Sequence, residues 1–144
     1  MTRKIFLCTL IILALAGQVH AGTQRFGNYV VNVPSGWTGE LQGQTLIVKS
    51  DNVNASVAVA FAKTGEASLT DIVERLYIQM SGENLEQDED GDYTFTFTNL
   101  AGGESLAMIT GGDGYYLVLS MTGYNIDGIE DDLNTIIDSL DYED

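Results

Sequence analysis

The sequence predicts an α+β fold in which two main helices lie on a mostly antiparallel sheet. Short runs of alternating apolar and polar residues, typical of half-buried strands, occupy most of the chain after residue 22. Two longer segments, within residues 68–82 and 125–140, carry apolar residues at helical spacing instead. Because neither helix belongs to a regular strand–helix–strand alternation, a parallel sheet is disfavoured.

The N-terminus, residues 1–21, reads as a signal peptide. An Arg-Lys pair precedes an apolar run from Ile5 to Ala16, and small residues stand where a signal peptidase would cleave. The run of about 12 residues is shorter than the roughly 20 that a membrane-spanning helix needs. We therefore expect export to the periplasm or the medium, no membrane span, and a single α+β domain over residues 22–144.

In the first half of this domain, the residue pattern predicts short strands separated by turns. Val57, Val59 and Phe61 alternate with small residues, so one side of their strand would be buried and the other would let a helix lie close. We expect Trp37 to be a core aromatic whose indole N–H finds a backbone acceptor. The alternative is an exposed Trp37 that marks a partner site. Strands are predicted over residues 26–33, 37–41, 45–50 and 55–61.

A capped helix follows these strands. Ser68 to Asp71 read Ser-Leu-Thr-Asp, a capping-box-like start in which side-chain oxygens accept hydrogen bonds from free backbone N–H groups. Apolar residues then recur at i, i+3, i+4, i+7, i+8 and i+11 from Leu69 to Met80, which gives one apolar stripe. Gly82 is predicted to end the helix in the left-handed conformation.

In the last third of the chain, the residue pattern predicts a meander of antiparallel strands followed by a second helix. Glycine-rich segments at 100–103 and 111–114 stand where hairpin turns need positive φ. The helix begins near Asn125 or Asp127, and its acidic first turns suit the positive end of the helix dipole. Residues 141–144 are acidic at the opposite end, so we expect this tail to fray. Strands are predicted over residues 93–98, 104–110 and 115–122.

The composition excludes several classes of function. Without residues 1–21 the chain has four Lys and Arg against 21 Asp and Glu, a net charge of −17, and neither Cys nor His. Thiolate chemistry, Ser-His-Asp triads and the usual zinc or copper sites therefore lack their essential side chains. Four scattered basic residues do not neutralise a nucleic-acid backbone. Carboxylate-only hydrolysis remains, but such enzymes usually need a larger frame, so we expect no enzyme and no cofactor.

One acidic segment supports a metal hypothesis. Residues 86–92 place five carboxylates around Gly91, with Asp88, Asp90 and Asp92 at alternate positions as in a calcium-binding loop. The template fails at its last position, where a strand residue replaces the bidentate glutamate. The alternative is a solvated hairpin turn built on Asp90-Gly91. The sequence leaves a weak calcium site and a solvated turn both open.

The order of elements resembles a known family. Val33 to Trp37 read V-P-S-G-W after an opening strand, and the final helix ends in Ser139-Leu140. Over about residues 24–140 the chain resembles the PsbP-like, or Mog-type, domains, including their small exported bacterial relatives. The resemblance implies an αβα sandwich around an antiparallel sheet. It also implies a non-enzymatic accessory role, either in the assembly of a larger complex or in binding a partner protein.

Together these observations predict an exported, non-catalytic binding module that contacts an unidentified partner protein. The alternative is a weak calcium- or small-ligand-binding protein that uses the loop 86–92. The high negative charge has two interpretations as well. It confers solubility, or it steers the protein towards a basic partner through long-range attraction.

Overall fold

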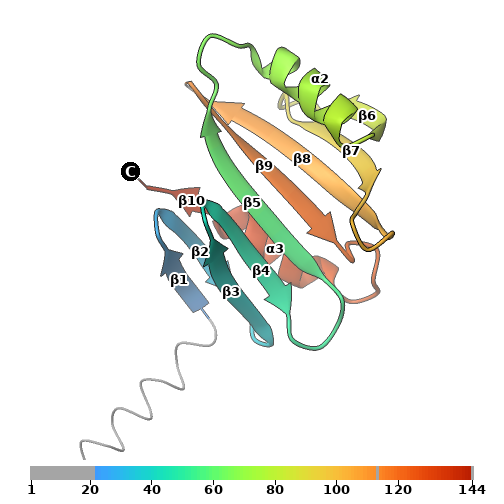
Figure 1. The fold of residues 1–144 in the computed structure, drawn as a ribbon. Coiled ribbons are helices and arrows are strands. Elements are labelled where there is room, and N and C mark those ends of the chain that lie inside the picture. Colours follow the sequence, from blue (N-terminus) through green and yellow to red (C-terminus); the bar gives the residue numbers. More distant parts are fainter. Residues whose placement is uncertain (1–21, 113, 144) are drawn as a thin grey trace, which may run out of the picture.

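The computed structural model describes residues 22–112 and 114–143, and the predicted signal peptide lies outside this range. The described residues form two antiparallel sheets and two helices (Figure 1). The larger sheet has seven strands in the order β3-β4-β5-β9-β8-β7-β6, and the smaller has the order β1-β2-β10. The strands are β1 (Gly22–Phe26), β2 (Tyr29–Val33), β3 (Trp37–Gln42), β4 (Thr45–Ser50), β5 (Ser56–Lys63), β6 (Glu83–Gln87), β7 (Tyr93–Thr98), β8 (Glu104–Gly112), β9 (Tyr115–Thr122) and β10 (Asp141–Tyr142), and the helices are α2 (Leu69–Gln79) and α3 (Glu130–Ser139).

The two helices lie on opposite faces of the large sheet, which confirms the predicted αβα sandwich. In β9, Leu119 packs in the cluster that contains α3, whereas its neighbour Val118 packs in the cluster that contains α2. Successive strand residues point to opposite faces, so the two helices are separated by the sheet. Every strand pairing in both sheets is antiparallel. Among the described residues, neither helix has the length and apolar character needed to cross a membrane.

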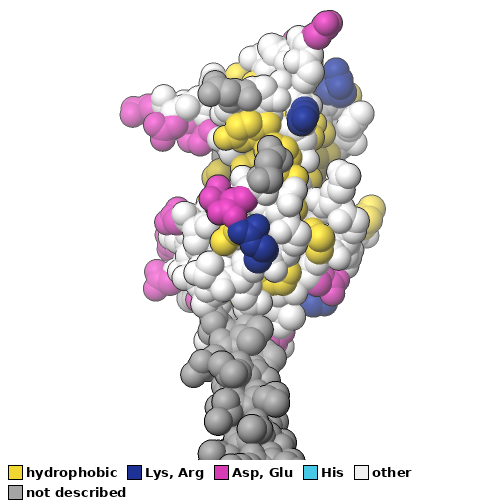
Figure 2. Space-filling model, turned by 90° about the vertical axis from the view of Figure 1, so that its left-hand side faces the viewer, with side chains coloured by type: hydrophobic (Ala, Val, Ile, Leu, Met, Phe, Trp, Pro, Cys, Tyr) yellow, Lys and Arg dark blue, Asp and Glu magenta, His cyan; other side chains and the backbone are white. Residues whose placement is uncertain are grey.

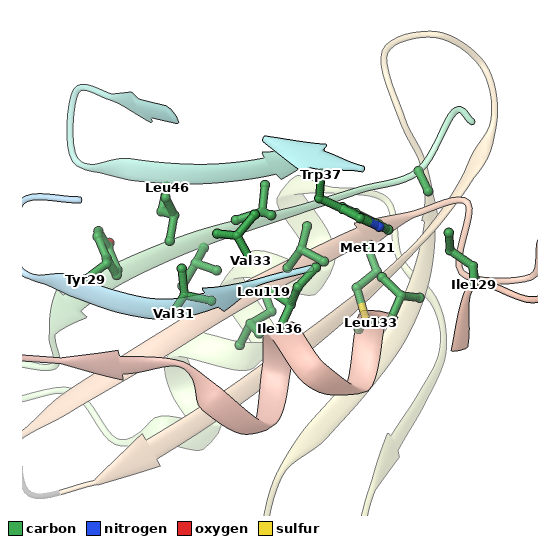
Figure 3. Close-up of a cluster of buried hydrophobic side chains, with 14 residues drawn as sticks. Tyr29, Val31, Val33, Trp37, Leu46, Leu119, Met121, Ile129, Leu133 and Ile136 are labelled. Atoms are coloured by element: carbon green, nitrogen blue, oxygen red, sulfur yellow. The ribbon is translucent and has the colours of Figure 1, made fainter. Parts of the chain in front are cut away.

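The larger core lies between the seven-stranded sheet and a cover made of β2 and α3 (Figure 3). The cover contributes Val31 and Val33 from β2 and Ile136 from α3, all fully buried. The sheet contributes alternate residues of four strands, because those positions share one face. The fourteen buried members are Tyr29, Val31, Val33, Trp37, Leu46, Val48, Ala55, Val57, Val59, Leu119, Met121, Ile129, Leu133 and Ile136.

Trp37 is a core residue, as the first of the two interpretations predicted. Its side chain is 4% exposed and lies against the α3 side of the core (Figure 3). The predicted hydrogen-bond partner is wrong, however. The indole Nε1–H donates to the Asp132 carboxylate at 2.9 Å, from β3 to the first turn of α3. The acidic first turn of α3 thus positions a side-chain acceptor where we expected a backbone carbonyl.

The smaller core lies beneath α2, over the β7–β8 end of the sheet. It contains Val73 from α2 together with Phe95, Ala107 and Ile109, each at most 1% exposed. The Ser68 hydroxyl caps this helix by accepting a hydrogen bond from Asp71 N–H at 3.1 Å, as predicted. The predicted end is wrong, because the left-handed residue is Ser81 (φ 52°) and not Gly82.

Gly82 has a packing role instead. A Cβ atom on Gly82 would lie 2.5 Å from Tyr77 Cδ2 and 2.7 Å from Phe95 Cδ2, which is closer than any real contact. These two rings meet edge-to-face, with centroids 5.4 Å apart. The glycine therefore lets the chain leave α2 directly over an aromatic pair.

Three strands, β1, β6 and β10, were not predicted as such. The predicted strand 26–33 is interrupted by a tight turn in which Gly27 has φ 59°, so that β1 and β2 form a hairpin. β6 is an exposed edge strand with a register shift between Glu83 and Glu86. The predicted helix start near Asn125 or Asp127 is also too early, because α3 begins at Glu130.

The predicted fraying of residues 141–144 is wrong for the part that the structure describes. Asp141 and Tyr142 pair with β2, and Glu143 N–H donates to the Asn28 carbonyl at 2.8 Å. The Tyr142 ring stacks on Phe61, with centroids 3.8 Å apart. Arg25 forms a hydrogen-bonded ion pair with Glu143. Aromatic packing and main-chain pairing thus outweigh the unfavourable charges at the helix end.

Candidate functional site

A hollow lies at the C-terminal end of α2, and we call it the α2 cavity. Its volume is about 950 Å³. It lies on the same sheet face as α2, beyond the point where that helix ends. Its floor comes from β5, β8 and β9, and its walls come from the loops at residues 98–103 and 123–126 and from the last residues of α2. Loops that meet at one end of a rigid sheet commonly carry binding sites.

Hydroxyl groups line the floor of the α2 cavity. Ser56, Thr122 and Ser105 are paired in register across β5, β9 and β8, so their side chains share one face in a row. Ser105 is fully buried and shares a hydrogen bond of 3.0 Å with the Thr122 hydroxyl. The Asn99 side-chain amide donates to Ser105 Oγ at 3.0 Å. Ser120 adds a fourth hydroxyl on the same face, two residues before Thr122 in β9.

Apolar side chains surround this polar floor. Met80, Phe97 and Ile126 are partly buried in its walls. The lining residue Leu100 is fully exposed, and Ile78, one residue before the lining residue Gln79, is 75% exposed on the outer side of α2. We define the α2-end surface as Ile78, Gln79, Leu100 and Ala101, all of which are exposed. Large apolar side chains with this exposure at the mouth of a cavity are a feature of binding surfaces.

The electrostatic environment of the α2 cavity is negative and contains no basic lining residue. The negative end of the α2 dipole faces this end of the molecule, and the last turn of α2 has no basic residue to offset it. The lining carboxylate, Glu104, accepts a hydrogen bond from the Tyr124 hydroxyl. That hydrogen bond, with smaller contributions from burial and charge, raises the pKa of Tyr124 above its usual value.

A second hollow of about 420 Å³ lies at the opposite end of the molecule, between the β1–β2 turn, the β3–β4 turn and β10. Figure 2 shows this face, where hydrophobic side chains gather beside Lys or Arg and Asp or Glu side chains. Its aromatic side chains pack on one another: Tyr142 stacks on Phe61 and meets Tyr29 edge-on at 5.0 Å. The Tyr29 hydroxyl donates to the Gln44 carbonyl and accepts from Phe61 N–H. These side chains are therefore already engaged in holding β10 in place.

The acidic segment 86–92 forms the end of the β6–β7 hairpin. Asp88 Oδ1 accepts hydrogen bonds from the backbone N–H groups of Asp90 and Asp92, each at 2.9 Å. The carboxylate of Asp88, one of the predicted calcium ligands, is thus engaged in hydrogen bonds to the backbone of its own turn. Among the described residues, no group of three or more acidic side chains converges in a geometry that could hold a metal ion. This arrangement matches the solvated turn, and calcium binding at Asp88, Asp90 and Asp92 stays a prediction.

The charge of the chain is distributed unevenly along the sequence. The interpretation of the basic residues as scattered missed this asymmetry. Residues 76–144 contain 16 Asp and Glu and no Lys or Arg. All four basic residues of the domain lie between Arg25 and Arg75. The cavity floor was missed as well, because Ser56, Ser105 and Ser120 are far apart in the sequence. The available signal was that Ser56 falls on the small-residue side of its alternating strand. Ser105 and Ser120 share their strand faces with the apolar residues Ile109 and Val118 and carry no such signal.

The chain is similar to known proteins in its fold but matches none of them by sequence. No protein-family model and no curated protein matches the chain. The solution structure of cyanobacterial PsbP (CyanoP) from Synechocystis sp. PCC 6803 matches with a TM-score of 0.55 and 19% identity, over 85% of this chain and 93% of that one. A crystal structure from Bacteroides thetaiotaomicron matches with a TM-score of 0.52 and 19% identity, over 87% of this chain but only 49% of that one. The chain therefore has a PsbP-like fold and spans about half of the Bacteroides protein.

Proposed function

We propose that the protein is an exported, non-catalytic binding module that contacts a partner protein through the α2-end surface. The observation that carries the proposal is the exposure of Ile78 and Leu100 at the open end of the sandwich. Exposed apolar side chains close to a cavity are a feature of interaction surfaces. Apolar anchors of this kind contribute much of the binding energy in protein interfaces.

The chemistry of the chain supports binding over catalysis. The domain has neither Cys nor His, so nucleophile–base pairs of the common kinds have no members here. The fold that the chain shares with cyanobacterial PsbP agrees with a role as a binding module. Export is supported by the pattern of residues 1–21, a basic start followed by an apolar run and a small-residue cleavage motif.

The charge distribution supports a basic partner. The half of the chain that follows Arg75 supplies most of the α2-end surface and the acidic hairpin end at residues 86–92, and it contains no basic residue. Long-range attraction of this kind raises the rate of association with a basic protein and weakens as salt is added. Apolar contacts at Ile78 and Leu100 would then supply the short-range affinity.

The test is affinity capture with variants matched in charge. The protein expressed from the full chain is immobilised and exposed to extracellular or periplasmic extract of its source organism. The double variant Ile78→Asp/Leu100→Asp is compared with Leu41→Asp/Val53→Asp, whose two residues are each 42% exposed outside the α2-end surface. Both variants add two negative charges. We expect a partner that wild type and the Leu41/Val53 variant retain equally and that the Ile78/Leu100 variant retains about tenfold less.

Mass spectrometry of the retained proteins, quantified at two salt concentrations, provides the readout. Circular dichroism of each variant checks that the fold is intact. Equal retention by both double variants would remove the α2-end surface from the proposal. Loss of the partner in the Leu41/Val53 variant alone would assign binding to another surface.

A further inference from the structure

We infer that the α2 cavity is a binding site for a neutral carbohydrate, beside the surface that we propose for contact with a partner protein; Gln79, Leu100 and Ala101 belong to both. The cavity volume of about 950 Å³ lies at the upper end of the range for small-molecule sites, which runs from about 300 to about 1,000 Å³. The space therefore suffices for more than one sugar ring. The inference follows from three properties of the lining: its hydroxyl groups, its apolar walls and its charge.

The hydroxyl groups of the floor differ in how they are engaged. The Ser105 and Thr122 hydroxyls bond to each other, and Asn99 donates to Ser105, so this part of the floor is fixed. Ser56 and Ser120 are half-buried in the same floor, and their hydroxyls make no hydrogen bond to any other described residue. A hydroxyl both donates and accepts, which is the pairing that sugar hydroxyls need. The floor thus offers two free groups beside a rigid polar support.

The walls complement the other part of a sugar ring. Met80, Phe97 and Ile126 present partly buried apolar surface around the polar floor. Sugar rings combine hydroxyl groups at their edges with C–H groups on their faces. The lining therefore pairs polar groups with apolar surface, and its polar groups can fix the orientation of such a ligand.

The charge of the lining selects neutral ligands over ions. An anion would meet the negative end of the α2 dipole, the Glu104 carboxylate and a domain of net charge −17, with no basic residue in the lining. A metal cation would find one carboxylate, and that one accepts a hydrogen bond from Tyr124. A neutral carbohydrate is not repelled by the negative charge and does not need several carboxylate ligands.

The test is a titration followed by nuclear magnetic resonance on the protein expressed from the full chain. The probes are neutral mono- and disaccharides of glucose, galactose, mannose and N-acetylglucosamine, with glucuronate as the anionic control, each up to about 10 mM. We expect at least one neutral sugar to shift the amide resonances of Ser56, Ser105 and Ser120 in a saturable way. Glucuronate is expected to bind at least about tenfold more weakly than the matching neutral sugar.

Two variants make the test specific. Ser56→Ala/Ser120→Ala removes the free hydroxyls and leaves the Ser105–Thr122 pair in place, so we expect about a tenfold loss of affinity with an unchanged fold. Thr23→Ala/Ser35→Ala removes two exposed hydroxyls outside the cavity and should leave the affinity unchanged. The inference is overturned if no neutral sugar shifts the cavity resonances, if glucuronate binds as well, or if both variants behave alike. Ser56 and Ser120 lie outside the α2-end surface, so the Ser56→Ala/Ser120→Ala variant should still capture the protein partner.

Discussion

The two faces of the seven-stranded sheet are closed to different degrees. On one face, β2 and α3 together cover a core of fourteen buried residues. On the other, α2 alone covers four, and the sheet beyond its C-terminal end forms the floor of the α2 cavity. On the α3 side, the C-terminal segment is also held in place, because Tyr142 pairs with β2 and Glu143 N–H donates to the Asn28 carbonyl. We infer that the α3 face supplies most of the stability, and our proposals place binding on the α2 face.

Matched valines on the two faces should show the largest difference. Val57, in the larger core, and Val73, in the smaller one, are each at most 1% exposed. Val57→Ala is expected to cost about 3 kcal/mol, because the enclosed core around it relaxes little. Val73→Ala should cost about 1.5 kcal/mol, close to the transfer term, because α2 can shift to fill the space. Denaturant unfolding of both variants measures these costs, and equal values would contradict the comparison.

Gly82→Ala should cost about 2 kcal/mol, because the added Cβ would overlap the rings of Tyr77 and Phe95. The effect belongs to the α2 face, so amide exchange should quicken in α2 and β7 and stay unchanged in α3 and β2. Gly43→Ala is a useful reference, since nothing lies within 4 Å of a Cβ there, although its φ of 62° adds strain. Uniformly faster exchange throughout the protein would show that the two faces unfold as one unit.

Tyr142→Ala tests the attachment of the C-terminus and should cost about 1 kcal/mol. The change removes the stacking on Phe61 and the edge contact with Tyr29. Thermal unfolding gives the cost, and limited proteolysis near residues 141–143 reports release of β10. A variant with unchanged stability and unchanged proteolysis would restore the original expectation of a frayed tail.

Alkaline pH should produce the smallest effect, on the α3 face. Burial raises the pKa of Tyr29 above 10.0, the hydrogen bond from Phe61 N–H lowers it in part, and Tyr142 raises it slightly. The unfolded chain ionises this group first, so the stability it contributes is complete below about pH 10 and is lost as pH rises through the folded-state pKa. Unfolding free energies between about pH 9 and about pH 11 should fall less steeply in Tyr29→Phe than in wild type. Identical slopes would contradict this assignment.

Local patterns predicted much of the fold. β7 and β9 have the predicted bounds, because the aromatic–threonine alternation of β7 and the run of aromatic and aliphatic residues in β9 are local features of the sequence. The Ser68 cap is equally local. β6 and β10 could not be predicted this way. Glu83–Gln87 has no strand-like alternation and becomes a strand only by pairing with β7, and β10 likewise depends on β2.

The candidate site was less predictable than the fold. The acidic segment 86–92 drew attention because its residues are contiguous, and the structure shows Asp88 bonded within its own turn. The α2 cavity assembles Ser56, Ser105 and Ser120 from three strands that meet only in the folded sheet. Its exposed rim residue Leu100 stands in a segment that the sequence marks simply as a turn.

The most direct test of the division between the two faces is amide hydrogen exchange of the protein with and without its captured partner. The account predicts added protection at residues 76–82 and 97–105, around the α2-end surface, and no change in β1, β2 and α3. Protection confined to the β1–β2 and β3–β4 turns, or spread evenly over both faces, would contradict it.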